Sequence, residues 1–336
     1  MSKVGIVANP ASGRDIRRLV AQAWVVSNQE KAALTARLLR GLEAAGVEQV
    51  LYMPEPAGIC PKACQKMGST RLRVTPLEIP VSGGPEDSTR AAAAMVEVGV
   101  GCIVTLGGDG TNRAVFKGSG SEVPLLPIST GTNNVFSEFQ EGTTAGLAAG
   151  LLATGRTDRD TACTRSKVLW LHDPSGVVDL ALVDLAVTTR TFIGARAIWE
   201  VDHLKELFLT RAQPWSIGLS AIGGFVETVT AESPRGLHLV FGPDGRRVTA
   251  PLGPGLFREI SVSAVHRLAP GEKKPLEMRE PVTLAFDGER DRLAGIGEEL
   301  EVRLSSDGPW VVDTARAASA GLGGGTCLKT AYKSTR

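Results

Sequence analysis

A glycine-rich turn that follows an apolar run constrains the fold of this chain more than any other feature. Residues 101–106 predict a buried strand, and Gly107-Gly108-Asp109-Gly110-Thr111 comes directly after them. Glycine adopts positive φ easily and lets the backbone approach a ligand closely. Backbone N–H groups at a turn from strand to helix attract anions, and the dipole of the following helix adds to this attraction. The turn therefore predicts a strand–turn–helix unit with a site for phosphate.

The rest of the first half alternates apolar runs with helical patterns. Leu34, Leu38 and Leu42 fall on one face of a helix, and Gly46 follows that helix as a C-terminal cap would. Such alternation is typical of a parallel sheet with helices on both faces, in which ligands bind at the carboxyl ends of the strands. Strands are predicted at 3–8, 47–53, 72–79, 101–106 and 125–128, and helices at 31–45, 85–98 and 143–154.

The second half consists of short apolar runs separated by Gly, Pro and Asp, which predicts a β-rich domain interrupted by one helix at 195–210. We therefore expect an α/β fold: an N-terminal Rossmann-like parallel-sheet domain at 1–142 and a β-rich C-terminal domain at 143–316. A last segment, 317–336, is expected to return to the first domain. The predicted strands of the second half lie at 177–189, 236–241, 259–265, 282–286, 300–304 and 310–312.

Composition excludes several classes of protein. The 37 basic and 36 acidic residues leave no basic excess for binding nucleic acid. Five cysteines, an odd number without paired metal-ligand spacing, favour free thiols in a reducing compartment over disulfides or zinc. The most apolar long stretch, 91–106, is interrupted by Glu97 and by glycines, so we expect no membrane span. We expect a cytoplasmic protein, a homo-oligomer, whose partners are small molecules.

Asp109 stands where a carboxylate would repel a bound phosphate, so its presence needs a reason. One reason is a base that takes a proton from an attacking hydroxyl, and another is a carboxylate that carries Mg²⁺ and cancels the repulsion. A third is structural, because Asp often bonds to the backbone of a tight turn. From these residues alone, all three remain open.

Three further polar loops are expected at strand ends. Ser129-Thr130-Gly131-Thr132-Asn133-Asn134 follows the strand at 125–128, and its hydroxyls and amides suit ribose or phosphate, although Thr and Asn also cap helices. We expect this loop to lead into a helix. Asn9-Pro10-Ala11-Ser12-Gly13 and Asp287-Gly288-Glu289 also follow strands, and each is otherwise an ordinary turn. Because the first domain's strand ends meet at one edge of the sheet, the loops at 9–13, 107–111 and 129–134 should line one crevice.

These loops occur in the order found in the superfamily of NAD kinases, diacylglycerol and sphingosine kinases and phosphofructokinases. Over roughly residues 1–315 the chain resembles most closely the ATP-NAD kinase-like proteins associated with acetoin catabolism, the AcoX type. Residues 127–136 carry the resemblance to that branch. The resemblance implies a phosphotransferase that uses ATP and Mg²⁺ and has NAD as its acceptor.

The resemblance also implies roles for individual residues. Asp109 would activate the acceptor hydroxyl, which in NAD kinases belongs to the adenosine ribose. The residues that would hold the nucleotide and its phosphates are Asn9, Gly107, Gly108, Gly110, Thr111, Asn112, Thr130, Gly131, Thr132, Asn133 and Asn134. The residues that would contact the acceptor are Asp184, Ser220, Asp287 and Glu289.

The chain departs from NAD kinases at one position of the acceptor site. NAD kinases grip the acceptor ribose with an Asn-Glu pair, whereas the matching region here is Val183-Asp184-Leu185. Three functions therefore stay open. They are an NAD kinase-like conversion of NAD to NADP linked to acetoin catabolism, a kinase of a diacylglycerol-type lipid or another small molecule, and a non-enzymatic nucleotide-binding regulator.

Overall fold

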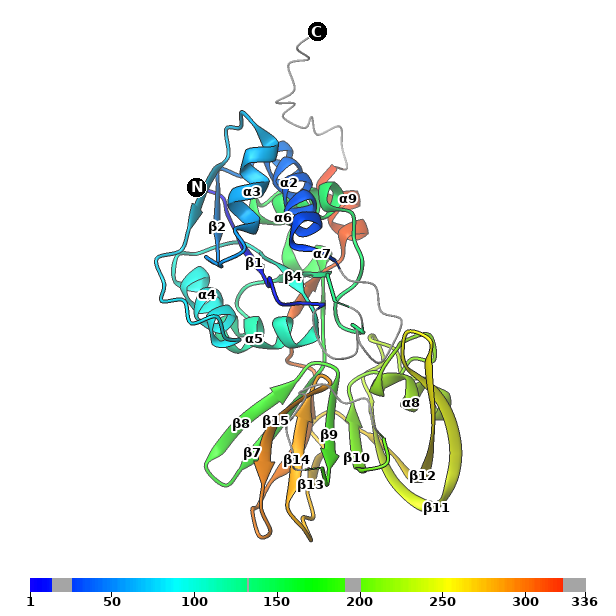
Figure 1. Ribbon diagram of the computed structural model, residues 1–336. Helices are drawn as coiled ribbons and strands as arrows, with labels where there is room; N and C mark the ends of the chain where they lie inside the picture. The colour runs from blue at the N-terminus through cyan, green and yellow to red at the C-terminus, as the bar shows by residue number, and fades with distance from the viewer. Residues whose placement is uncertain (14–25, 132, 191–200, 323–336) are drawn as a thin grey trace.

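The computed structural model of the protein describes residues 1–13, 26–131, 133–190 and 201–322. The chain forms an α/β domain, in the upper part of Figure 1, and a β-rich domain below it. This arrangement confirms the fold class expected from the sequence.

The first domain is built on one sheet with the strand order β3-β2-β1-β4-β5-β17-β6 among the described residues. Neighbouring strands are parallel from β3 to β17, and β6 pairs antiparallel with β17. The order reverses between β1 and β4, which is where α/β sheets of this kind bind ligands. The strands are β1 (Lys3–Ala8), β2 (Gln49–Tyr52), β3 (Arg73–Pro76), β4 (Ile103–Gly107), β5 (Leu125–Ser129), β6 (Cys163–Arg165) and β17 (Trp310–Val312).

Helices cover both faces of this sheet. Apolar side chains of α2, α3 and α6 pack on one face, and those of α4 and α5 pack on the other. Ser27 and Glu30 form a capping box at the start of α2, and Gly46 ends that helix in the left-handed conformation, as predicted. The helices are α2 (Asn28–Ala45), α3 (Ile59–Met67), α4 (Glu86–Glu97), α5 (Asp109–Ser119), α6 (Gly142–Ala153), α7 (Arg159–Ala162) and α9 (Thr314–Leu322).

The second domain packs two sheets against each other. Their strand orders among the described residues are β12-β11-β10-β9-β14-β15 and β13-β16-β7-β8, and side chains from both sheets share one apolar cluster. A short helix, α8 (Leu219–Val226), packs on β11. The strands are β7 (Val168–Asp173), β8 (Gly176–Ala181), β9 (Asp184–Thr188), β10 (Leu204–Leu209), β11 (Gly236–Gly253), β12 (Leu256–Leu268), β13 (Lys273–Pro275), β14 (Val282–Phe286), β15 (Glu289–Ala294) and β16 (Glu301–Ser305).

The division of the chain differs from the expected boundary at residue 142. Helix α6 packs against α2 of the first domain, and β6 and β17 complete the first sheet. Close packing explains this, because a Cβ on Gly146 would lie 2.0 Å from the Leu38 carbonyl oxygen. Helix α9 packs on α6, so the chain returns to the first domain up to residue 322. We therefore propose residues 166–309, between β6 and β17, as the second domain.

The helix predicted at 195–210 is wrong for residues 204–209, which form β10; residues 195–200 lie outside the described part of the chain. Strand β10 pairs antiparallel with both β9 and β11, and Leu207 and Leu209 are fully buried. Pairing on both sides and burial outweigh the helix propensity of Lys205 and Glu206.

The helix expected directly after Asn134 is also wrong. Described residues 133–141 are irregular apart from a bridge between Ile128 and Glu138, and the next helix begins at Gly142. This segment instead supplies backbone N–H groups to a buried carboxylate of the functional site.

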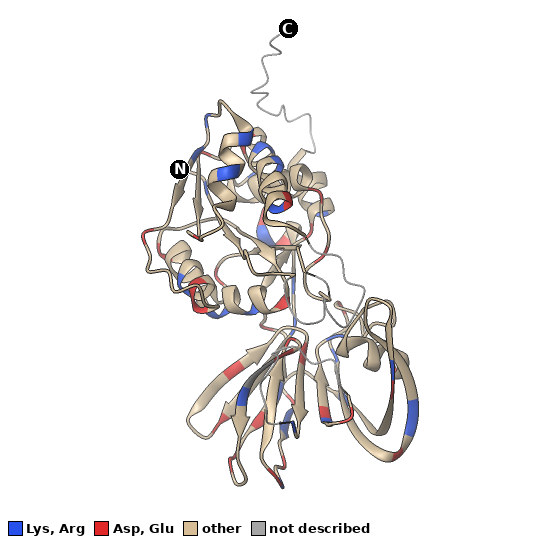
Figure 2. Cartoon of the chain, in the orientation of Figure 1, with Lys and Arg blue, Asp and Glu red and all other residues tan. Residues whose placement is uncertain are grey.

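Several expectations from composition can be compared with the structure. Cys60, Cys64, Cys102 and Cys163 are free thiols, as expected, and Cys327 lies outside the described residues. Basic and acidic residues are distributed over both domains (Figure 2). Across the described ranges, every helix is too short or too polar to cross a membrane.

Candidate functional site

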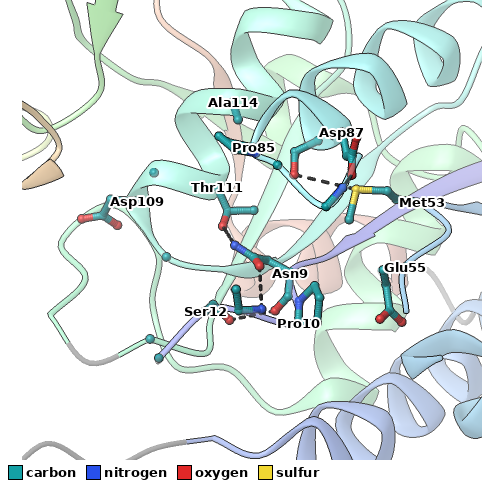
Figure 3. A pocket seen from close by; sticks show the side chains of 18 of the residues that line it. Asn9, Pro10, Ser12, Met53, Glu55, Pro85, Asp87, Asp109, Thr111 and Ala114 are labelled. Atoms are coloured by element: carbon teal, nitrogen blue, oxygen red, sulfur yellow. Dashed lines mark hydrogen bonds between the residues drawn. The ribbon is translucent and has the colours of Figure 1, made fainter. Parts of the chain in front are cut away.

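A cavity of about 540 Å³ opens beside the carboxyl ends of β1 and β4. Loops that follow β1, β4 and β5 line it, together with two residues of the second domain, and Figure 3 shows part of this lining. The sequence predicted that these loops would share one crevice. The predicted site residues that line the cavity are Asn9, Gly108, Asp109, Gly110, Thr111, Gly131, Asn133, Asn134, Asp287 and Glu289.

The loop after β1 is fixed to the glycine turn by Asn9. The Asn9 amide Nδ2 donates to Thr111 Oγ1 at 2.9 Å, and its Oδ1 accepts from the Ala11 N–H at 2.8 Å. Lys31 of α2 is fully buried and donates from Nζ to the carbonyl oxygens of Asn9 and Ser12, at 2.9 and 3.0 Å. Sequence reasoning missed Lys31, although its spacing from Leu34 and Leu38 places it on the buried face of the helix.

The glycine turn and the Ser129 loop meet at one side chain, Asn134. A Cβ on Gly108 would lie 2.8 Å from Asn134 Oδ1, and a Cβ on Gly131 would lie 2.8 Å from Asn134 Nδ2. Asn134 Nδ2 donates to Ser129 Oγ at 2.8 Å, which holds the side chain in this position. Glycine is therefore required at both positions by the close approach of the two loops.

Asp109 is the first residue of α5 and is 7% exposed. Its Oδ2 accepts from the Val135 N–H at 2.8 Å, and its Oδ1 accepts from the N–H groups of Phe136 and Ser137 at 3.0 and 3.2 Å. The structural role that the sequence left open is therefore present. Asp109 belongs to the cavity lining, and in Figure 3 its carboxylate points away from Asn9 and Thr111, toward the side on which these backbone bonds hold it.

Burial raises the pKa of Asp109 above its ordinary value. The three backbone N–H groups and the charge of Arg211 lower this pKa and so act against the effect of burial. The carboxylate is therefore a stronger base than an exposed aspartate, and it is held in place by the segment 135–137.

The second domain contributes Asp287 and Glu289 to the cavity. Asp287 has a positive φ of 51°, and its Oδ1 accepts from the backbone N–H groups of residues 182, 183 and 184. Burial raises the pKa of Asp287 to about 6; the charge of Arg113 lowers this pKa and that of Asp109 raises it. The Glu289 carboxylate lies beside Gly110, 3.5 Å from the position that a Cβ there would occupy.

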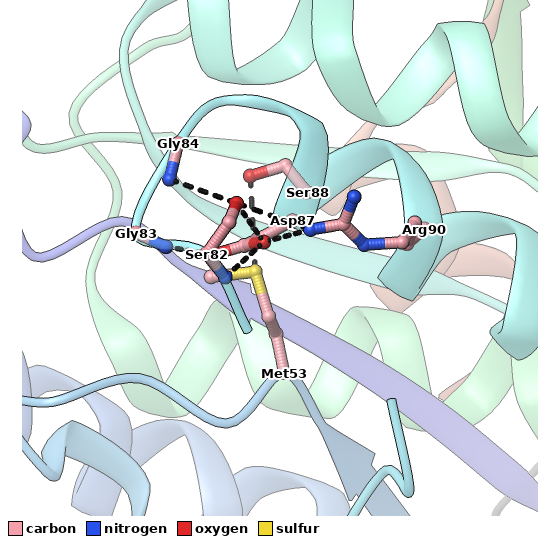
Figure 4. A network of polar contacts seen from close by, with 7 residues as sticks. All are labelled: Met53, Ser82, Gly83, Gly84, Asp87, Ser88 and Arg90. Atoms are coloured by element: carbon pink, nitrogen blue, oxygen red, sulfur yellow. Dashed lines mark hydrogen bonds and ion pairs between the residues drawn. The ribbon is translucent and has the colours of Figure 1, made fainter. Parts of the chain in front are cut away.

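The other end of the cavity is lined by Met53, Pro54, Pro85 and Ala114, and its lip is held by Asp87. Asp87 accepts from the N–H groups of Ser82 and Gly83, from the Ser82 hydroxyl and from Arg90, as Figure 4 shows. Sequence reasoning missed this network, since Asp87 reads as an ordinary residue of the first helical turn. This part of the lining thus combines apolar side chains with the carboxylates of Glu55 and Asp87.

The remaining predicted site residues support the loops from behind. Asn112 is fully buried, accepts from Thr105 Oγ1 at 2.6 Å and donates to the Gly108 carbonyl oxygen at 3.0 Å. The Thr130 hydroxyl bonds to Ser12 Oγ at 2.8 Å. Gly107, Asp184 and Ser220 also lie outside the cavity lining. A Cβ added to Gly107 would meet Thr111. Asp184 accepts from the Gly288 N–H, and Ser220 donates to the Arg211 carbonyl oxygen. Thr132 lies outside the described residues.

Within the described residues, no three His, Cys, Asp or Glu side chains lie close enough together to hold a metal ion. Any divalent cation bound here would need oxygen ligands from its substrate in addition to those of the protein. This is the usual situation for Mg²⁺ in sites that bind nucleoside phosphates.

Two family models match this chain. The acetoin catabolism protein X C-terminal domain matches residues 167–307, and the ATP-NAD kinase N-terminal domain matches residues 4–157. The two matches divide the chain between 157 and 167, close to the end of β6. The match at 4–157 contains the loops at 9–13, 107–111 and 129–134.

A solved structure shows the same fold. The chain is similar to a diacylglycerol kinase-like protein from Bacillus anthracis str. Sterne, with a TM-score of 0.50, 14% identity and coverage of 93% of this chain and 97% of that one. It also matches yeast NADH kinase in complex with NADH, with a TM-score of 0.49, 16% identity and coverage of 99% and 90%.

A curated relative covers nearly the whole chain. Acetoin catabolism protein X from Cupriavidus necator is 38% identical over 325 residues, which span 93% of this chain and 90% of that protein. The loops that suggested the resemblance lie together in one cavity, and both family models agree with it. The chain therefore belongs to the acetoin catabolism protein X family.

Proposed function

We propose that the protein is an ATP-dependent phosphotransferase that acts on a hydroxyl group in the cavity beside Asp109. The observation that carries this proposal is the position of Asp109. It is a buried carboxylate with a raised pKa, it stands at the N-terminus of α5 directly after the glycine turn, and it belongs to the cavity lining. The match of residues 4–157 to the ATP-NAD kinase model supports the same reaction class.

In the proposed reaction the acceptor oxygen forms a bond to the γ-phosphorus of ATP, the bond from that phosphorus to the β-phosphate oxygen breaks, and ADP leaves. The proton of the acceptor hydroxyl passes to Asp109 Oδ2. Backbone N–H groups of the glycine turn and the hydroxyl of Thr111 hold the phosphates, and Asn9 positions Thr111. The following helix dipole favours the negative charge of the phosphates.

Magnesium suits this site as a companion of the nucleotide. Asp109, Asp287 and Glu289 line the cavity. We propose Glu289 for contact with the cation, because its carboxylate lies beside Gly110 of the glycine turn, where the phosphates would bind. When bound, Mg²⁺ would neutralise phosphate charge and reduce its repulsion from these carboxylates.

NAD is the first acceptor to test, as the family resemblance suggests. A second candidate, a kinase of another hydroxyl compound, is favoured by the position of Asp184. This residue takes the place of the ribose-gripping Glu of NAD kinases, yet it lies outside the cavity lining and accepts from the Gly288 N–H at 3.0 Å. The apolar residues Met53, Pro54, Pro85 and Ala114 in the cavity lining also suit an acceptor with hydrocarbon groups.

The test is a transfer assay with γ-labelled ATP and Mg²⁺, in which NAD, diacylglycerol and acetoin are offered separately. Label in NADP supports the NAD kinase-like activity, and label in one of the other acceptors supports the second candidate. Binding of ATP without transfer to any of them, or to a wider panel of alcohols, would instead identify a nucleotide-binding regulator.

A further inference from the structure

Arg211 of the second domain reaches the segment that holds Asp109 in the first domain. It follows β10 with one residue between them and is 8% exposed. Its Nη2 donates to Ser166 Oγ at 3.0 Å, its guanidinium lies 5.4 Å from the centre of the Phe136 ring, and its carbonyl oxygen accepts from Ser220 Oγ. The guanidinium is therefore in contact with Ser166 and Phe136, whereas Ser220 holds the Arg211 backbone and Nε has no hydrogen-bond partner among the described residues.

The contact between Arg211 and this segment runs through one peptide group. Arg211 Nη1 lies 3.5 Å from the Val135 carbonyl oxygen, and the N–H of the same peptide group, on Phe136, donates to Asp109 Oδ1 at 3.0 Å. The peptide dipole thus lies between a positive and a negative charge. Each charge favours the orientation that suits the other.

The two charges also act on each other directly. Arg211 lowers the pKa of Asp109 against the effect of burial, and Asp109 is the foremost of the charges that raise the pKa of Arg211 against its own burial. Loss of the guanidinium would leave the Asp109 carboxylate buried without this compensation. Its pKa should then rise further, because burial disfavours the charged form.

We propose that Arg211 is a positioning residue for the reaction: through the Val135–Phe136 peptide it holds Asp109 in place and keeps it ionised. This inference rests on the proposed function. It also implies that the base is complete only when the second domain is docked, since Arg211 and Asp109 belong to different domains.

The first experiment does not depend on activity. Urea unfolding is measured at pH 8 for the wild type, Asp109→Asn, Arg211→Gln and the double variant. Asp109→Asn changes the unfolding equilibrium constant by some factor in the wild type. We expect this factor to be about fivefold smaller in the Arg211→Gln background. Arg113→Gln is the matched control, because Arg113 is also buried at the domain contact but bonds to Asp179 and the Leu180 carbonyl. Additive effects of the first pair would overturn the proposal.

The second experiment follows kcat/KM for the acceptor against pH. In Arg211→Gln the acid limb should move upward by about one pH unit, while the KM for ATP changes little, and Arg211→Lys should move the limb back. An unchanged acid limb with a lower plateau would indicate a merely structural role and contradict the proposal.

Chemical rescue adds a direct check, because a second cavity of about 250 Å³ adjoins Arg211 and is also lined by Phe136 and Ser166. Methylguanidinium should restore turnover to Arg211→Ala more than methylammonium at the same concentration. Equal effects of the two salts would count against the proposal. If the wild type transfers no phosphate at all, the proposed function fails, and the unfolding experiment still decides whether Arg211 holds the Asp109 carboxylate.

Discussion

The stability of the Asp287→Asn variant relative to the wild type should increase as pH rises from acidic to neutral. All three N–H groups of residues 182–184 donate to Asp287 Oδ1, and an amide oxygen in the same place can accept them. The substitution therefore removes a buried charge while retaining the bonds to Oδ1, and only the second contact of the Leu182 N–H, with Oδ2 at 3.2 Å, is lost.

The magnitude follows from the pKa of Asp287, which burial raises from 3.8 to about 6 in the folded protein. Since the folded state binds the proton more tightly, the resulting stability is complete below the unfolded pKa and is lost as pH rises through the folded pKa. One pKa unit corresponds to about 1.4 kcal/mol. The stability of the variant relative to the wild type should therefore rise by about 2 kcal/mol between pH 4.5 and pH 7.5.

The assay is urea unfolding of both proteins at several pH values in this range, with the difference in free energy of unfolding taken at each pH. Asp179→Asn is a control with the opposite sign. Although burial acts to raise the pKa of Asp179, the charges of Arg113 and Lys117 lower it overall. That variant should lose stability relative to the wild type as pH rises to about 4.5, so its series is extended to lower pH, and the difference should stay nearly flat above that value. A difference for Asp287→Asn that is flat across the range, or that falls with pH, would refute the reasoning.

Three further substitutions test the packing around the site. Lys31→Met removes the Nζ donor to the Ser12 carbonyl oxygen and one of the donors to the Asn9 carbonyl oxygen, which also accepts from the Ser12 hydroxyl. The variant should therefore lose about 1–3 kcal/mol of stability and bind ATP more weakly, measured by urea unfolding and calorimetry; retained affinity would contradict the role of Lys31 in shaping the Asn9 loop. Gly146→Ala places a Cβ 2.0 Å from the Leu38 carbonyl oxygen and should lower the free energy of unfolding by about 1–3 kcal/mol, whereas the exposed Thr144→Ala should cost less than half as much. Asp87→Ala removes the acceptor that holds Ser82 and Gly83, so the 82–84 backbone should lose protection in hydrogen exchange while α2 keeps its own.

Local sequence signals were sufficient for strands β1 to β5 and for the loops that line the cavity. The glycine turn and the loops after β1 and β5 are recognisable from their residue types at the ends of predicted strands. Parallel sheets bring such strand ends together. The predicted base, Asp109, lies in the cavity for this reason.

Signals that depend on tertiary pairing were missed or misread. Residues 204–209 look helical until β9 and β11 pair with them, and α6 looks like the start of a new domain until Gly146 packs against α2. The sequence around Arg211 contains no motif that predicts its proposed positioning role. Its contact with the segment 135–137 forms only when the second domain meets the first. Ser220 was predicted to contact the acceptor from the family resemblance, yet its hydroxyl bonds to the Arg211 backbone and it lies outside the cavity lining.

The central claim is that Asp109 removes the proton from the acceptor, and Asp109→Asn compared with Glu289→Gln tests it most directly. Turnover is followed with γ-labelled ATP and whichever acceptor the wild type labels, and ATP affinity is measured in parallel. If Asp109 is the base, Asp109→Asn should lower kcat by about 10²–10⁴-fold with nearly unchanged affinity for ATP. Glu289→Gln should mainly raise the Mg²⁺ concentration that turnover requires. Wild-type turnover by Asp109→Asn, with the large loss found in Glu289→Gln instead, would show that the base is Glu289 and contradict the account.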